Sequence, residues 1–173
     1  MLDIDLQSML QLVEVATRFD LPWEAEQVSS ELVRSGWEPV GSVSLPYPKR
    51  LGFGDFLLGI EYDGDLVAIG VTLKEWQADW NSADYARTVA EGYGDKIDDC
   101  RELAARLASL FGQRFSVEPE DLVLDADEFP FVHAECWKIA NLHVTLGLEH
   151  LDPDDTPIRI SLYLSQGSMD KFN

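Results

Sequence analysis

Apolar residues between Ile97 and Phe111 recur at steps of three and four, which is the spacing of one face of a helix. Asp95 is a suitable N-cap for this helix, and Gly112 can end it in a left-handed conformation. The segments on both sides alternate between apolar and polar residues, as strands do. We therefore expect a long central helix over 95–111 that packs on an antiparallel sheet.

Two further helical patterns come first in the chain. Apolar residues within 5–19 share one face, Pro22 restarts the pattern, and residues 23–35 give a shorter helix that ends at Gly36. Such a helix pair must bury its apolar faces, and the strands that follow offer the only surface of sufficient area.

Strands are predicted wherever apolar and polar residues alternate between turn signals. The expected strands or short apolar runs are 37–45, 56–62, 67–73, 115–117, 122–124, 131–139, 142–148 and 158–164. Residues 46–50 are expected to form a loop, and Asp63-Gly64 marks the clearest hairpin turn. The fold class predicted is α+β: a mostly antiparallel sheet of about six to seven strands, with an N-terminal helix pair and one long central helix packed on it.

The chain is expected to form a single domain over residues 1–173, in which 166–173 is a flexible tail. No internal repeat of 20–50 residues is visible. Gly92 and Gly94 interrupt the apolar steps that lead toward the central helix, so a break or loop is expected there.

Composition indicates a folded protein, because 46% of the 173 residues are hydrophobic and five are tryptophan. No apolar run approaches the roughly 20 residues that a membrane span requires. The first residues lack the basic start and apolar middle of a secretory signal. We therefore expect a cytoplasmic protein without a membrane partner.

The formal net charge of −19 is the least ordinary feature, and residues 51–100 alone carry −8. Such a charge repels nucleic acid, so no nucleic-acid partner is expected. Two readings stay open for the excess acid: it keeps the protein soluble, or it is directed at a basic partner, whose association it would accelerate.

Residues with reactive side chains do not assemble into a recognisable catalytic or metal motif. Cys100 and Cys136 are expected to be buried free thiols. A pairing that joins Ile139 to Leu142 would set His133 opposite Leu148 and away from His143, which argues against a metal site. No phosphate loop or nucleophile motif is present either, so we expect no enzyme, no cofactor and no metal.

Partner binding is the remaining function, and residues 75–95 are the best candidate because they combine aromatic and acidic side chains. Aromatic residues are typical interface anchors, and acidic neighbours can orient a cationic partner. The alternative is that the aromatic residues close the edge of the sheet and the acids are solvated. The candidate partner-binding residues are Glu75, Trp76, Gln77, Asp79, Trp80, Asp84, Tyr85, Glu91, Gly92, Tyr93, Gly94, Asp95 and Gln113.

The layout of the chain resembles small actinobacterial immunity proteins such as the immunity factor of the tuberculosis necrotizing toxin. The resemblance consists of the paired N-terminal helices, the Gly36-Trp37-Glu38-Pro39-Val40 step into the sheet, Trp80-Asn81-Ser82-Ala83-Asp84-Tyr85 before the long helix, and a strand-rich C-terminal half. It covers most of the chain but contains no diagnostic catalytic or ligand motif. It implies an antitoxin that forms a 1:1 heterodimer with an NAD-hydrolysing toxin domain and blocks its basic active-site cleft.

Under that resemblance, the glycine-flanked loops at 92–94 and 112–113 are the candidates for insertion into the toxin. The alternative function is an acidic secretion chaperone that holds an effector segment as a dimer. A third class, a small enzyme or ligand-binding domain, would need a deep pocket with convergent polar groups.

Overall fold

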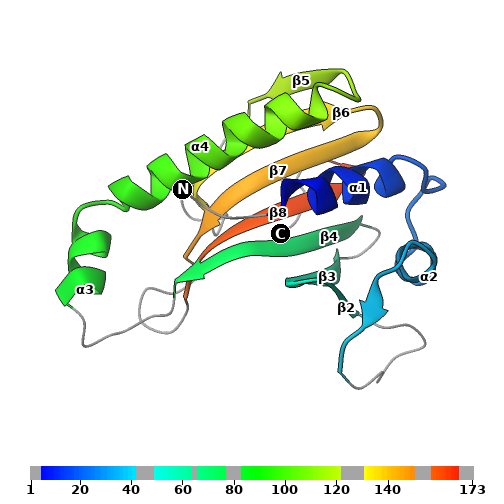
Figure 1. Ribbon diagram of the computed structural model, residues 1–173, viewed down its shortest axis with the longest axis horizontal. Helices are drawn as coiled ribbons and strands as arrows, with labels where there is room; N and C mark the ends of the chain where they lie inside the picture. The colour runs from blue at the N-terminus through cyan, green and yellow to red at the C-terminus, as the bar shows by residue number, and fades with distance from the viewer. Residues whose placement is uncertain are drawn as a thin grey trace.

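In the part of the chain that the computed structural model describes, eight strands form one antiparallel sheet, and helices cover one face of it (Figure 1). The structure describes residues 5–41, 49–63, 66–76, 83–121, 131–150 and 157–167. The predicted α+β class is therefore confirmed, and the strand count of six to seven is corrected to eight.

The four described helices include the three that the periodicity predicts. Their bounds are α1 Leu6–Ala16, α2 Ala25–Arg34, α3 Ala83–Ala90 and α4 Gly94–Phe111. Helix α1 lies within the predicted 5–19, and Asp5 caps it, because Asp5 Oδ1 accepts a hydrogen bond of 3.1 Å from the Gln7 amide. None of the described helices is long and apolar enough to cross a membrane.

The sheet consists of two sets of consecutive antiparallel strands, β1–β4 and β5–β8, which meet in its middle. Their bounds are β1 Glu38–Pro39, β2 Arg50–Phe53, β3 Phe56–Asp63, β4 Leu66–Trp76, β5 Val117–Glu120, β6 Phe131–Ile139, β7 Leu142–Glu149 and β8 Ile158–Ser165. The order across the sheet is β1-β2-β3-β4-β8-β7-β6-β5. Two halves of the chain, each with two helices followed by four strands, thus join through the β4–β8 pair.

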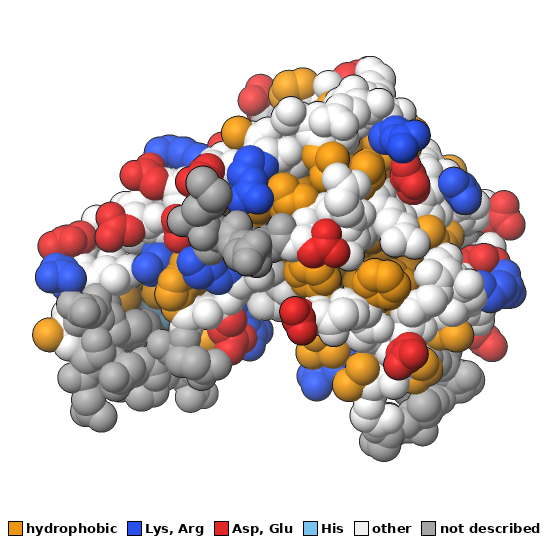
Figure 2. Space-filling view, viewed as in Figure 1, with side chains coloured by type: hydrophobic (Ala, Val, Ile, Leu, Met, Phe, Trp, Pro, Cys, Tyr) orange, Lys and Arg blue, Asp and Glu red, His pale blue; other side chains and the backbone are white. Residues whose placement is uncertain are grey.

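One apolar core lies between the helices and the sheet face beneath them. It joins Val13 of α1, Leu32 of α2 and Leu107 of α4 to strand residues such as Ile69 and Leu162, all almost fully buried. Because side chains alternate along a strand, each central strand gives every second residue to this core. Figure 2 shows this face, where apolar side chains gather toward the middle and charged ones lie around them.

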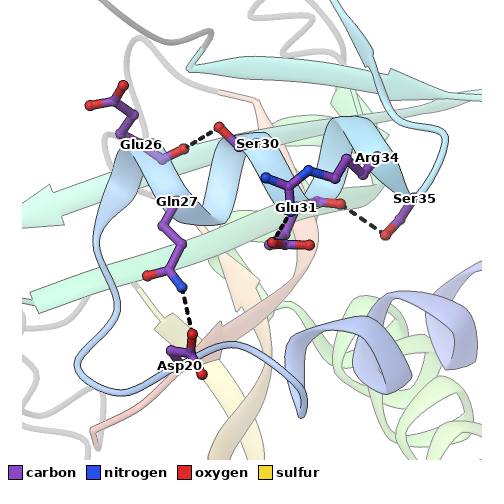
Figure 3. A network of polar contacts seen from close by, with 7 residues as sticks. All are labelled: Asp20, Glu26, Gln27, Ser30, Glu31, Arg34 and Ser35. Carbon is purple, nitrogen blue, oxygen red and sulfur yellow. Dashed lines mark hydrogen bonds and ion pairs between the residues drawn. The ribbon is translucent and has the colours of Figure 1, made fainter.

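Polar side chains on the exposed side of helix α2 make hydrogen bonds and an ion pair with residues of the same helix (Figure 3). The Ser30 and Ser35 hydroxyls donate to backbone carbonyls one turn earlier, at 2.8 and 2.9 Å, and Arg34 pairs with Glu31. Gly36 follows at φ +100°, a conformation that favours glycine and ends the helix where predicted.

Both ends of the central helix differ from the prediction. Tyr93, at φ 63°, is the N-cap of α4, and Asp95 lies in the first turn instead. Gly112 is right-handed at φ −61°, so it does not form the left-handed cap that its sequence position suggests. The predicted break is confirmed, since residues 91–93 form a turn between α3 and α4.

Several strand boundaries also differ. Strand β2 begins at Arg50, the last residue of the predicted loop, and was not anticipated. Of the predicted strand 37–45, residues 42–45 lie outside the described part of the chain, and β1 takes two of the five that are described. Strand β5 spans 117–120, including Pro119 at the edge of the sheet, where a missing amide costs least. Residues 122–124 and 168–173, called a strand run and part of a tail from the sequence, lie outside the described residues.

No described helix covers the second face of the sheet, which we call the helix-free face. Large side chains of this face lie across glycines of neighbouring strands. A Cβ on Gly147 would lie 2.3 Å from the Phe131 ring, and one on Gly70 would lie 2.9 Å from the ring of Tyr163. The Phe131 and Tyr163 rings meet edge to face, with centroids 5.8 Å apart.

This packing predicts the effect of adding one methyl group. Gly147→Ala should lower the free energy of unfolding by about 1–3 kcal/mol, because the Phe131 ring must move. Gly59→Ala is the matched control: its nearest atom would be 3.9 Å away, so it should change stability by less than about 0.5 kcal/mol or increase it. Urea unfolding measures both variants, and equal stability of the two would contradict the packing.

Candidate functional site

A hollow of about 460 Å³ on the helix-free face brings together polar and charged side chains from β2, β3, β4, β7 and β8. Residues of this hollow include Arg50, Asp55, Leu57, Gly59, Glu61, Gly70, Thr72, Glu75, Glu149, Arg159, Ser161 and Tyr163. Two arginines face four carboxylates, which leaves two excess negative charges when all are ionised. Its volume is within the range of ligand-binding clefts.

An irregularity in β4 delivers Glu75 to this hollow. The pairing of β4 with β8 shifts between Thr72 and Lys74, as at a β-bulge. Before the shift, Val71 points to the core, and regular alternation would send Glu75 the same way. After the shift, Glu75 pairs with Arg159 on the helix-free face, and its Oε2 accepts a hydrogen bond of 2.8 Å from Arg159 Nε.

Glu149 is the most buried carboxylate of the hollow, with 5% of its surface exposed. Its Oε1 accepts a hydrogen bond of 3.0 Å from the Tyr163 hydroxyl. Burial raises the pKa of Glu149 above its ordinary value, hydrogen bonds from Ser161 and Tyr163 oppose that rise, and the charge of Glu61 adds to it. Glu149 thus has neutral hydroxyl donors, and the positive charge of Arg159, its neighbour across the β7–β8 pair, acts to lower its pKa.

Glu61 and Tyr163 converge over Gly70. A Cβ on Gly70 would lie 3.5 Å from Glu61 Oε1 and 2.9 Å from the Tyr163 ring. Glu61 remains partly exposed at the mouth of the hollow, yet the loss of water around its carboxylate raises its pKa. Burial and the two neighbouring carboxylates raise the pKa of Tyr163, so its hydroxyl stays protonated and donates.

Two of the aromatic residues predicted as partner anchors, Trp76 and Tyr93, make contacts within the protein. Trp76 is half-buried, and the ammonium groups of Lys74 and Lys96 lie 4.4 and 4.7 Å from its ring centroid. Lys74 also pairs with Asp99 at 3.3 Å, which ties the end of β4 to α4. Trp76 therefore packs between β4 and α4, and its role as a partner anchor stays a prediction.

Tyr93 is likewise engaged. Its hydroxyl lies 2.7 Å from Nδ1 of the buried His150, and the two rings meet edge to face at 5.5 Å. Around it, Glu91, Gly92, Gly94 and Asp95 are exposed. We call residues 91–95 the α3–α4 corner; its backbone is exposed, while its tyrosine is anchored inward.

Gln113, which was also predicted to contact a partner, lies far from this corner. Gln113 is exposed beyond the other end of α4, about 28 Å away at 1.5 Å per residue, so it cannot join the corner in one small insertion. Gln77, Asp79 and Trp80 lie outside the described residues, as do the side chains of Asp84 and Tyr85.

The cysteines and histidines take the structural places expected of them. Cys100 and Cys136 are buried free thiols, and burial raises the pKa of Cys100 to about 12. His133 lies opposite Leu148, as the hairpin register predicts, and its Nε2 is 3.1 Å from Glu135 Oε1. Among the described residues, no three His, Cys, Asp or Glu side chains are placed to share a metal ion.

Sequence reasoning found Glu75 but missed Glu61, Glu149 and Tyr163. A signal for their face was present, because Tyr163 alternates with the core residues Leu162 and Leu164. Their proximity was hidden, since it depends on the β4–β8 pairing of strands about 90 residues apart, which no local pattern reveals.

Glu149 should make the stability of the protein depend on pH. The native state holds the Glu149 proton more tightly than the unfolded state does, so stability should fall as pH rises from about 4.5 through the raised pKa. The loss is about 1.4 kcal/mol for each unit by which the pKa is raised. Glu149→Gln should remove this part of the fall in urea unfolding, and Glu102→Gln, on the exposed side of α4, should not. Superimposable profiles of Glu149→Gln and the native chain would refute the assignment.

Comparison with known proteins adds no relative to this description: no family model, no curated protein and no solved structure matches the chain. The function must therefore be argued from the fold, the hollow and the charge of the chain itself.

Proposed function

We propose that this chain is an immunity protein that binds a cognate toxin 1:1 and blocks its active-site cleft, with an NAD-hydrolysing domain as the target. The observation that carries the proposal is the unmatched acid. If every Lys and Arg were paired with one carboxylate, 19 carboxylates would still lack a cation. A cleft that binds a dinucleotide phosphate is basic, so an acidic protein can occupy it competitively without chemistry.

The α3–α4 corner has a shape suited to such a cleft. Helix α3 extends beyond the ends of the strands, and the corner joins it to α4 (Figure 1). Glu91 and Asp95 are exposed there, while the contact between Tyr93 and His150 holds the corner against the sheet. An anchored protrusion loses little conformational entropy on binding, which favours affinity.

The secretion chaperone is the weaker alternative. A chaperone that holds an extended effector segment needs a continuous apolar groove. The exposed large apolar residues within the described ranges are Leu21, Val33, Val40 and Leu57. Val40 and Leu57 lie on either side of Gly52, near one edge of the sheet. The mass of the free protein in solution separates the two functions, since the chaperone acts as a dimer and the inhibitor binds 1:1.

Capture and inhibition test the proposed function directly. The tagged chain is incubated with extract of its native cells, and bound protein is eluted with high salt and identified by mass spectrometry. We expect one basic partner whose NAD hydrolysis stops when one equivalent of the chain is added back. A captured partner whose activity the chain leaves unchanged would refute inhibition.

Charge reversal tests the corner. Glu91→Lys with Asp95→Lys should slow association with the captured partner by about tenfold at low salt and should reduce the salt dependence of the rate. Glu118→Lys with Asp121→Lys, two exposed acids beyond the far end of α4, is the control with the same change in net charge. Equal slowing by both pairs would show that total charge, and not the corner, steers the partner.

A further inference from the structure

We infer that the hollow on the helix-free face receives a basic side chain of the protein partner, with an arginine guanidinium as the best fit. This inference rests on the proposed function, because it assumes a basic protein partner, and it assigns a second contact surface to it. The observations that carry it are the volume of the hollow, its excess of two negative charges and the arrangement of its carboxylates.

The carboxylates of the hollow are only partly matched by its own arginines. Arg159 is paired with Glu75 at 2.8 Å. Glu149 receives neutral hydroxyl donors instead, and Glu61 makes no ion pair among the described residues. Both retain acceptor capacity, since an ionised carboxylate offers about four lone-pair sites. An incoming cation would therefore find one buried acceptor, Glu149, where charge-assisted hydrogen bonds are strong, and one exposed acceptor, Glu61, at the mouth of the hollow.

The shape of the site favours a flat cation. The floor is open at Gly59, where the nearest atom to an added Cβ would be 3.9 Å away, and the Tyr163 ring, which covers the neighbouring Gly70, lies beside it. A guanidinium is planar, donates two parallel hydrogen bonds to a carboxylate and stacks on aromatic rings. The Arg159–Glu75 pair shows that a guanidinium and a carboxylate already fit together within these walls.

Peptide titration of the full chain tests the inference. The probes are acetyl-Gly-Arg-Gly-amide and the same peptide with citrulline, which keeps the shape of arginine but carries no charge. We expect the arginine peptide to shift the backbone amide signals of Gly59, Gly70 and Ser161 in two-dimensional NMR spectra, and the citrulline peptide to leave them in place. Binding should strengthen as pH rises, because the carboxylates must be ionised.

Matched variants locate the contact. Glu61→Gln and Glu149→Gln should each weaken arginine-peptide binding about tenfold, and Glu102→Gln, with the same change in net charge, should not. Dispersed spectra of each variant verify that it is folded. Equal weakening by Glu102→Gln, or equal shifts with the citrulline peptide, would overturn the inference.

Titration with spermidine distinguishes a free polyamine from a protein side chain as the occupant of the hollow. If spermidine shifts the same amides and the arginine peptide does not, the occupant is a free polyamine and the inference fails. Failure here is distinct from failure of the proposed function: peptide binding is read without a toxin, and inhibition of NAD hydrolysis is read without the peptide. A chain that inhibits its partner but ignores the arginine peptide keeps the function and loses this contact.

Discussion

Burial of apolar side chains between the helices and one face of the sheet is the interaction on which the rest of this structure depends. Each central strand gives alternate residues to the core, as Ile69 of β4 and Leu162 of β8 do, and the helices close over them. Alternation then commits the other residues of each strand to the opposite face. The residue composition of the helix-free face therefore follows from that of the core, because the strand residues that do not face the core face this side.

No described helix shields the backbone of the helix-free face from water. Large aromatic side chains that lie across neighbouring glycines cover it instead. Phe131 lies across Gly147, and Tyr163 lies across Gly70, so each large ring occupies the space that a neighbouring glycine leaves empty. Ser161 and Thr145 are nearly fully buried on the same face. This covering by aromatic residues brings the Tyr163 hydroxyl against Glu149, so packing and electrostatics of the hollow have one cause.

Much of the secondary structure is encoded in local sequence patterns and could be predicted from them. The periodicity of residues 97–111 indicates α4, and the alternation around Asp63-Gly64 indicates the β3–β4 hairpin. Short strands such as β2 carry too few residues for a pattern. Helix caps depend on tertiary contacts, as Tyr93 shows by bonding to His150. The two halves of the chain share their order of two helices and four strands but show no sequence repeat of 20–50 residues. This duplication is therefore visible only in the structure.

The shifted register of β4 decides which face of the sheet each side chain at the end of this strand reaches. Because alternation reverses between Thr72 and Lys74, Trp76 points toward α4 and Glu75 toward the hollow. Lys74 and Lys96 are then held against the Trp76 ring, and Lys74 also pairs with Asp99. These interactions link the end of β4 both to the helix that carries the α3–α4 corner and to the hollow. A partner bound at both surfaces would therefore depend on the irregularity in this one strand.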